Sequence, residues 1–365
     1  MPNDDLFAPV HPAEKLNPLF RTISGEGYEP ARALMRGLFK GFEDKDGNFV
    51  EQFQTAGFDA RLWELYLYAY LSDGGYELDA TFDRPDFIAQ RDANVVCIEA
   101  VTTNPPQGSP EPSLFDLARD SDGSPEAFAK LAAAHQEIAS IRLGTALKAK
   151  LSKRYWELAH VAGKPLVLAI EPFHDAGPIR LSDVGLANFL FGSRSRWHYD
   201  SNDQLVVESE VLEEHAHGAR RLQAGFFSAS DYAPEAENVS AVLFSNAATI
   251  AKFNRLGIQA GYQIARQSMM IREGTCYHHD PNASKPLQFR YIVGSGLHTE
   301  TWGEGLSLFH NPRARVPVPP GFFGDIAETR LGADGRPVSR VPRFHPFSSK
   351  TVTLFLDGEE GASSK

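Results

Sequence analysis

Residues 84–102 read RPDFIAQRDANVVCIEAVT, and this stretch decides the fold. Apolar residues dominate 86–90 and 95–102, which predicts two short strands. The polar residues 91–94 between them predict a tight turn, so the two strands should pair as an antiparallel hairpin. Asp86 begins the first strand, and Glu99 lies 13 residues after it in the second. The hairpin should therefore bring both carboxylates to one edge of a sheet.

Two carboxylates held this close repel each other unless a divalent cation lies between them. Oxygen ligands of this kind select Mg²⁺ or Mn²⁺. Such a metal lowers the pKa of a bound water and stabilises the negative charge that develops on a phosphate in a transition state. Asp86 and Glu99 are therefore the first candidates for a metal site.

A helix is predicted upstream of the hairpin, over residues 58–71. Glu64 is the only charged residue in the apolar and aromatic run LWELYLYAYL at 62–71. Burying an unpaired carboxylate costs several kcal/mol, so a buried Glu64 needs a metal, a basic residue or water as its partner. The alternative is that Glu64 points to solvent from a half-exposed helix.

The neighbouring segments complete an α/β pattern. A strand is predicted at 76–82 and a long helix from 125 to about 160, with a break near Gly144. The apolar run 166–170 then predicts a buried strand. The order is helix, three strands, helix, strand, and we expect the four strands to share one mixed central sheet flanked by helices.

This arrangement resembles the core of the PD-(D/E)XK, or restriction-endonuclease-like, nuclease superfamily. The resemblance rests on Glu64 in the first helix, on Pro85-Asp86, and on Glu99-Ala100-Val101 in the following strand. It implies that Asp86, Glu99 and the backbone carbonyl of Ala100 bind Mg²⁺ or Mn²⁺, with Glu64 joining them. It also implies phosphodiester hydrolysis of nucleic acid, with DNA favoured and RNA left open, and it is compatible with a homodimer.

One position departs from the superfamily motif, because its lysine, two residues after the Glu, is Val101 here. Some members supply the lysine from the following helix, where this chain offers Lys148, Lys150 and Lys153. We choose Lys150, since apolar residues precede it by one and two helical turns and place it along the stripe that should face the sheet. The alternative is that Lys150 rests its stem on the core and keeps its ammonium in water.

A second hypothesis is that the chain has the nuclease fold without catalytic activity. With Val101 in place of the motif lysine, the core would be a catalytically retired nuclease that serves as a binding or scaffold module. The three retained acids favour the enzyme, because a core without metal has no physical need for Glu64 in so apolar a helix. Hydrogen-bond networks are able to hold the same residues, so both hypotheses stand at this stage.

The composition is that of an ordinary globular chain of 365 residues, 42% hydrophobic and 23% charged. A net charge of -11 excludes a protein that coats nucleic acid through a broad basic surface, and leaves a localised groove. Two cysteines are too few for a disulfide framework, so we expect a reducing cytoplasm. No apolar run reaches the length of a membrane-spanning helix, so no membrane partner is expected.

Three regions are expected: an N-terminal helical extension at 1–56, the nuclease-like core at 57–175, and a C-terminal α/β elaboration at 176–365. In the first region, 29–42 has helical periodicity. In the last, strands are predicted at 204–211, 239–244, 288–293 and 351–356, and a short helix at 249–255.

A rival site lies in the C-terminal half. Its residues with ligand chemistry are Cys276, His278, His279, Asp280, His298 and His310. Their spacing matches no common zinc template, so we interpret them as structural. No sequence context marks either cysteine as an activated nucleophile.

Overall fold

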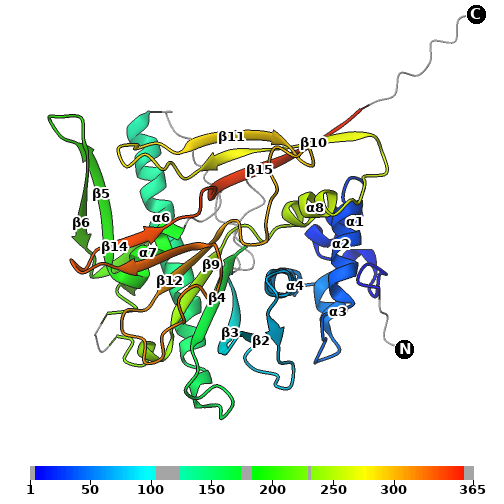
Figure 1. Ribbon diagram of the computed structural model, residues 1–365, viewed down its shortest axis with the longest axis horizontal. Coiled ribbons are helices and arrows are strands. Elements are labelled where there is room, and N and C mark those ends of the chain that lie inside the picture. Colours follow the sequence, from blue (N-terminus) through cyan, green and yellow to red (C-terminus); the bar gives the residue numbers. More distant parts are fainter. Residues whose placement is uncertain (1–4, 104–123, 174–182, 229–231, 357–365) are drawn as a thin grey trace, which may run out of the picture.

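Eight strands form one mixed sheet through the middle of the molecule (Figure 1). The computed structural model describes residues 5–103, 124–173, 183–228 and 232–356. The strand order is β1-β2-β3-β4-β9-β12-β13-β14, with parallel pairing at β3/β4, β4/β9 and β12/β13 and antiparallel pairing elsewhere. The strands are β1 (Glu77–Leu78), β2 (Phe87–Arg91), β3 (Asn94–Thr103), β4 (Leu166–Pro172), β9 (Ala241–Ser245), β12 (Leu306–His310), β13 (Ala327–Leu331) and β14 (Pro337–Arg340).

Helices cover both faces of this sheet. The described α-helices are α1 (Pro18–Ser24), α2 (Glu29–Phe39), α3 (Phe49–Gln54), α4 (Phe58–Asp73), α6 (Pro125–Leu151), α7 (Asp183–Phe191) and α8 (Ile250–Gln259). Helix α4 packs against the face that carries Val96 and Ile98 of β3, while α6 and α7 pack against the face that carries Val101. Because both faces are covered, every residue of β4 is buried and the strand is almost entirely apolar.

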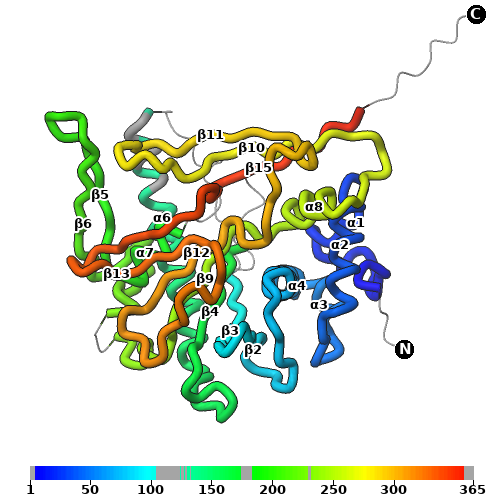
Figure 2. The backbone as a smooth tube through the Cα atoms, in the orientation of Figure 1, coloured from blue at the N-terminus to red at the C-terminus, as the bar shows by residue number. Residues whose placement is uncertain are grey.

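Shorter sheets surround the central one. Three strands form a second sheet in the order β11-β10-β15, and two hairpins, β5-β6 and β7-β8, stand beside α6 and α7. These strands are β5 (Ser193–Tyr199), β6 (Leu205–Val211), β7 (Glu214–His217), β8 (Arg220–Gln223), β10 (Ser268–Cys276), β11 (Leu287–Ile292) and β15 (Pro346–Phe355). Helices α2 and α8, far apart in the sequence, lie side by side (Figure 2).

Three tyrosine hydroxyls tie the N-terminal half to the C-terminal half. Each tyrosine is buried, and each hydroxyl donates to a backbone carbonyl more than 200 residues downstream. The pairs are Tyr66 with Trp302, Tyr70 with Phe323, and Tyr76 with Phe322. Since buried carbonyls need donors, the hydroxyls of the segment 66–76 satisfy carbonyls of the segment 302–323.

A buried ionic cluster joins α8 to the second sheet. Arg255 donates to both carboxylate oxygens of Glu300, at 2.7 and 2.8 Å, and Arg272 of β10 donates to Glu304 at 2.9 Å. Lys252 is fully buried and donates to the carbonyl of Glu304 at 2.7 Å. Each charge has an opposite charge or a carbonyl beside it, as burial demands.

The predicted sheet is confirmed, because β1, β2, β3 and β4 are consecutive strands of it. The predicted hairpin is also confirmed: β2 and β3 pair antiparallel from Phe87↔Ile98 to Arg91↔Asn94. Only residues 92 and 93 form the turn, with Asp92 at a φ of 54°. The elements predicted outside the core are present as well, as α2, β6, β9, β11, β15 and α8.

Two predicted elements need correction. The strand expected at 76–82 is only Glu77–Leu78, because the Asp79 carboxylate accepts the N–H of Thr81 and turns the chain away. The helix expected to reach residue 160 ends at Leu151, and Arg154 adopts a left-handed φ of 52° before a 3₁₀ turn at Tyr155–Glu157.

No break occurs at Gly144, where α6 is continuous. A Cβ at this position would lie 2.5 Å from Leu222 and 2.6 Å from Phe189. The glycine therefore allows α7 and β8 to approach α6 closely, rather than ending the helix. Within the described ranges, no helix combines the length and apolar character that crossing a membrane requires.

Candidate active site

Asp86 and Glu99 lie beside each other at the end of the β2-β3 pairing. The last paired residues there are Phe87 and Ile98, so Asp86 precedes the one and Glu99 follows the other. Oδ2 of Asp86 accepts the backbone N–H of Ala100 at 2.6 Å. Residues opposed in this way on antiparallel strands have Cβ atoms about 5 Å apart. The structure thus brings together the two acids that the hairpin was expected to join.

The backbone carbonyl of Ala100 opens toward the same place. Cys97 donates its N–H to Pro165, and Thr103 accepts the N–H of Phe173, so the odd-numbered residues of β3 turn their backbone groups toward β4. The even-numbered residues turn theirs toward β2, because both backbone groups of a strand residue point to the same neighbour. The carbonyl of Ala100 therefore lies on the Asp86 side, beyond the end of β2.

Glu99 is buried, with 4% of its surface exposed, and accepts two hydrogen bonds on one oxygen. Lys150 donates to Oε1 at 2.5 Å, and the Tyr155 hydroxyl donates to the same Oε1 at 2.7 Å. Among the residues that the structure describes, both bonds to this carboxylate end on Oε1. Oε2 is thus the oxygen left for a cation.

Lys150 reaches Glu99 from the last turn of α6. Leu143, Leu147 and Leu151, on the same helix, are buried against the sheet, which brings the Lys150 stem to the sheet as well. Its side chain is 30% exposed. Lys148 instead lies over the ring of Tyr232, 3.7 Å from its centroid. Lys153 lies beyond the end of α6, and of the three lysines considered Lys150 is the one that bonds to Glu99.

Val101 occupies the position where the superfamily motif has lysine. Its side chain is on the same face of β3 as Glu99, one pleat further along, and is 2% exposed. It packs in the apolar cluster between the sheet, α6 and α7. A lysine there would bury its ammonium among leucine and phenylalanine side chains, so the apolar residue suits its surroundings.

Glu64 is held by a basic residue of its own helix. Arg61 donates to Oε2 of Glu64 at 2.6 Å and also donates to Gln52 at 2.9 Å and to Asn48 at 3.0 Å. The Glu64 side chain is 15% exposed. Burial raises its pKa, Arg61 lowers it, and the nearby charge of Glu99 raises it again. Glu64 therefore borders the Asp86–Glu99 pair while its own hydrogen bond goes to Arg61.

The electrostatics of Asp86 show how crowded the acids are. Burial and, after it, the carboxylates of Glu99 and Glu64 together raise its pKa from 3.8 to about 8, although the bond from Ala100 opposes them. Burial and the bond to Glu99 also raise the pKa of the Tyr155 hydroxyl, which stays a donor at neutral pH. A site that suppresses ionisation in this way favours any cation that neutralises it.

Divalent-metal chemistry fits these residues in part. Within the described ranges, no three His, Cys, Asp or Glu side chains are already gathered as a metal-binding group. Mg²⁺ usually keeps several waters and takes only one or two protein carboxylates. Oδ1 of Asp86, Oε2 of Glu99 and the carbonyl of Ala100 supply a set of that size. Glu64 would reach a metal only by leaving Arg61.

Two residues of the site were missed from the sequence. Tyr155 lies in a segment predicted as helix, and nothing in its neighbourhood marks a tyrosine that folds back onto the preceding strand. Arg61 did carry a signal, since an arginine three residues before a glutamate lies on the same helix face. The lone acid at Glu64 therefore had its partner within one turn.

The histidines of the rival site have other partners. His298 contacts Glu304 at 2.7 Å and His310 contacts Glu328 at 3.2 Å. His279 contacts the carbonyl of Arg343 at 3.1 Å, and Cys276 is buried in β10. Within the described ranges, these residues do not gather as a group of three that could hold a metal ion.

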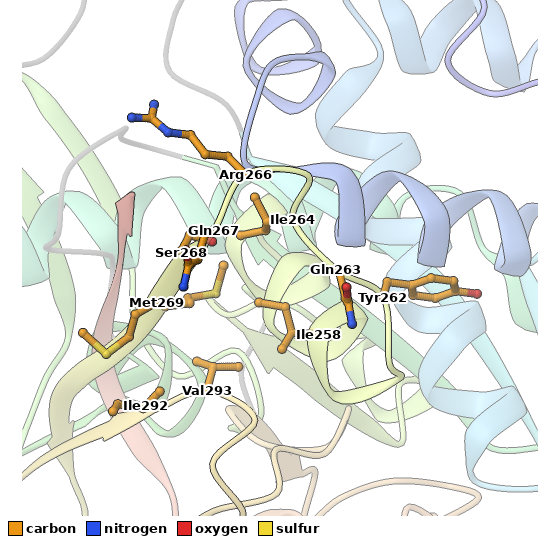
Figure 3. A pocket seen from close by; sticks show the side chains of 11 residues that line it. Ile258, Tyr262, Gln263, Ile264, Arg266, Gln267, Ser268, Met269, Ile292 and Val293 are labelled. Carbon is orange, nitrogen blue, oxygen red and sulfur yellow. The ribbon is translucent and has the colours of Figure 1, made fainter. Parts of the chain in front are cut away.

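A pocket of about 350 Å³ opens elsewhere, where α8 ends and β10 begins (Figure 3). Ile258, Met269 and Ile292 are among the apolar side chains that line it. None of its lining residues belongs to the Asp86–Glu99 group.

No protein-family model, curated protein or solved structure matches this chain.

Proposed function

We propose that this chain is a Mg²⁺- or Mn²⁺-dependent nuclease of the PD-(D/E)XK type. The observation that carries the proposal is the convergence of Asp86, Glu99, the Ala100 carbonyl and the Lys150 ammonium at one end of the β2-β3 hairpin. The element order around them, α4, β1, β2, β3, α6, β4, agrees with that of the nuclease core.

The residues have distinct roles in this proposal. Asp86 and Glu99 hold the cation, which supplies charge stabilisation and an activated water when bound. Lys150 takes the part of the missing motif lysine and contacts the scissile phosphate. Glu64 and Arg61 border the site as an ion pair. The substrate class is nucleic acid, with DNA as the proposed form and a homodimer as the proposed assembly.

The retired-nuclease alternative has one observation in its favour. In the structure, the ammonium of Lys150 bonds directly to Glu99. In a core that no longer takes metal, this ion pair would neutralise Glu99 permanently and serve only stability. The two functions therefore differ in whether a divalent cation binds at all.

Calorimetry with Mg²⁺ and Mn²⁺ separates them. The nuclease should bind Mn²⁺, and Asp86→Ala should abolish binding because it removes a ligand carboxylate. The lost acceptor for the Ala100 N–H should cost about 1–3 kcal/mol of stability, so the variant is checked for its fold before binding is compared. Asp59→Ala, which removes a half-buried carboxylate from the first turn of α4, is the matched control. Divalent-dependent cleavage of single- and double-stranded DNA should disappear with Asp86→Ala or Glu99→Ala. Absence of Mn²⁺ binding in the unaltered protein would favour the scaffold.

A further inference from the structure

Glu99 has two hydrogen bonds of different kinds on one oxygen. Lys150 brings a positive charge at 2.5 Å, whereas Tyr155 brings a neutral hydroxyl at 2.7 Å. A divalent cation beside Glu99 repels the first and leaves the second unaffected. The two donors therefore respond differently to the same ligand.

The two donors also differ in how firmly the fold packs around them. The Lys150 side chain is 30% exposed on a flexible four-carbon stem, so it is able to turn away from the sheet. Tyr155 is only 7% exposed and packs with Ile88, Cys97 and Val161 in a small apolar cluster behind Glu99. Tyr155 is therefore held by packing, whereas the Lys150 side chain has solvent beside it.

We propose that Glu99 exchanges partners: Lys150 neutralises it in the metal-free protein and is released toward substrate when a divalent cation binds, while Tyr155 holds the carboxylate in place throughout. The inference rests on the proposed function and adds an order of assembly to it. Lys150 becomes available to a phosphate only after the metal is in place. Tyr155 is a positioning residue, since it acts through Glu99.

Chemical labelling tests the release of Lys150. The full chain is treated with an amine-reactive reagent with and without Mg²⁺, and labelling at each lysine is measured by mass spectrometry. We expect Mg²⁺ to increase the labelling rate of Lys150 about threefold or more, as an ammonium leaves an ion pair. Lys153, exposed and less than one turn further on, is the internal control and should not change. Equal labelling of Lys150 in both conditions would overturn the exchange.

Metal affinity tests the two donors separately. Lys150→Met should raise the affinity for Mn²⁺ about threefold, because a competing cation is removed. Tyr155→Phe should lower it about tenfold, the usual effect of losing a group that orients a ligand. Tyr232→Phe, which alters a tyrosine next to Lys148, should leave it unchanged.

The outcomes distinguish this inference from the proposed function. If the unaltered protein binds no Mn²⁺, the proposed function fails. If it binds Mn²⁺ but Lys150→Met weakens binding, Lys150 is not a competitor and the exchange alone fails. Circular dichroism of each variant establishes that the fold is retained before affinities are compared.

Discussion

At the scale of single residues, the site is governed by the cost of crowding negative charge. Asp86, Glu99 and Glu64 each have a partner that offsets part of this cost: a backbone N–H, an ammonium with a hydroxyl, and a guanidinium. The partners of Glu99 and Glu64 include a positive charge, whereas the partner of Asp86 is a neutral backbone N–H. Asp86 is therefore the residue whose ionisation remains most suppressed.

That suppression predicts a pH dependence of stability. The pKa of Asp86 is about 8 in the folded protein against an ordinary 3.8, so the folded state binds a proton that the unfolded state lacks between these values. The free energy of unfolding of the metal-free protein should fall, through this group, as pH rises from about 4 to about 8. Asp86→Asn should remove this part of the pH dependence of the free energy of unfolding. The stability of the variant relative to the unaltered protein should therefore increase with pH up to about 8.

Urea denaturation in the presence of a chelator measures both proteins across this range. Asn keeps an oxygen that accepts the N–H of Ala100, so the comparison isolates the charge. Parallel pH profiles for the two proteins would show that Asp86 ionises normally. Adding Mg²⁺ should stabilise only the unaltered protein at the upper end of the range.

The sequence was sufficient to predict the two acids and Lys150, but not the hydrogen bond that Tyr155 donates to Glu99. Asp86 and Glu99 follow from period-two alternation and a tight turn, which are local properties. The contact of Lys150 with Glu99 also follows, because a helical stripe fixes which lysine faces the sheet. The bond from Tyr155 does not, since it depends on the left-handed turn at Arg154, and an arginine gives no local sign of that conformation.

At the scale of elements, the close contact of α6 with α7 depends on Gly144. Gly144→Ala gains helix propensity of about 1 kcal/mol, but the new Cβ would lie 2.5 Å from Leu222 and 2.6 Å from Phe189. Overpacking of this kind costs about 1–3 kcal/mol. We expect the variant to be destabilised, as measured by thermal or chemical denaturation.

Gly37→Ala in α2 is the matched control. Its Cβ would have only the Tyr262 hydroxyl nearby, at 4.0 Å, so the propensity gain is unopposed. This variant should be stabilised by up to about 1 kcal/mol. If both variants are stabilised, α6 and α7 are less tightly packed than the structure indicates.

At the scale of the whole molecule, the buried ionic cluster holds the second sheet onto α8. Burial opposes ionisation of Glu300, yet Arg255, Arg272 and Lys252 bring its pKa down to about 2. This lowered pKa contributes stability that is present above about pH 4.5 and is lost as pH falls toward 2. Glu300→Gln leaves buried positive charges uncompensated and should cost about 3–5 kcal/mol at neutral pH.

The loss of unfolding free energy in Glu300→Gln, relative to the unaltered protein, should become smaller as pH falls from about 4.5 toward 2. Denaturation at several pH values will measure this change. Glu273→Gln is the control, because Glu273 pairs with Lys350 at 2.7 Å on the partly exposed face of the same sheet. It should cost less than about 1 kcal/mol. Similar losses in the two variants would mean that the cluster contributes no more than a surface pair.

Tyr66 and Tyr70 of α4, and Tyr76 just before β1, also make folding during synthesis depend on residues that are added much later. The carbonyls that accept from Tyr66, Tyr70 and Tyr76 belong to residues 302, 323 and 322 respectively, which a ribosome adds more than 200 residues after the tyrosines. Every side chain of the Asp86–Glu99 group has been made long before then, but the helix behind it still lacks its buried partners. The nascent protein therefore has to reach residues 302–323 before these buried hydroxyls find their acceptors, and a chain that stops before them carries the acids without this support.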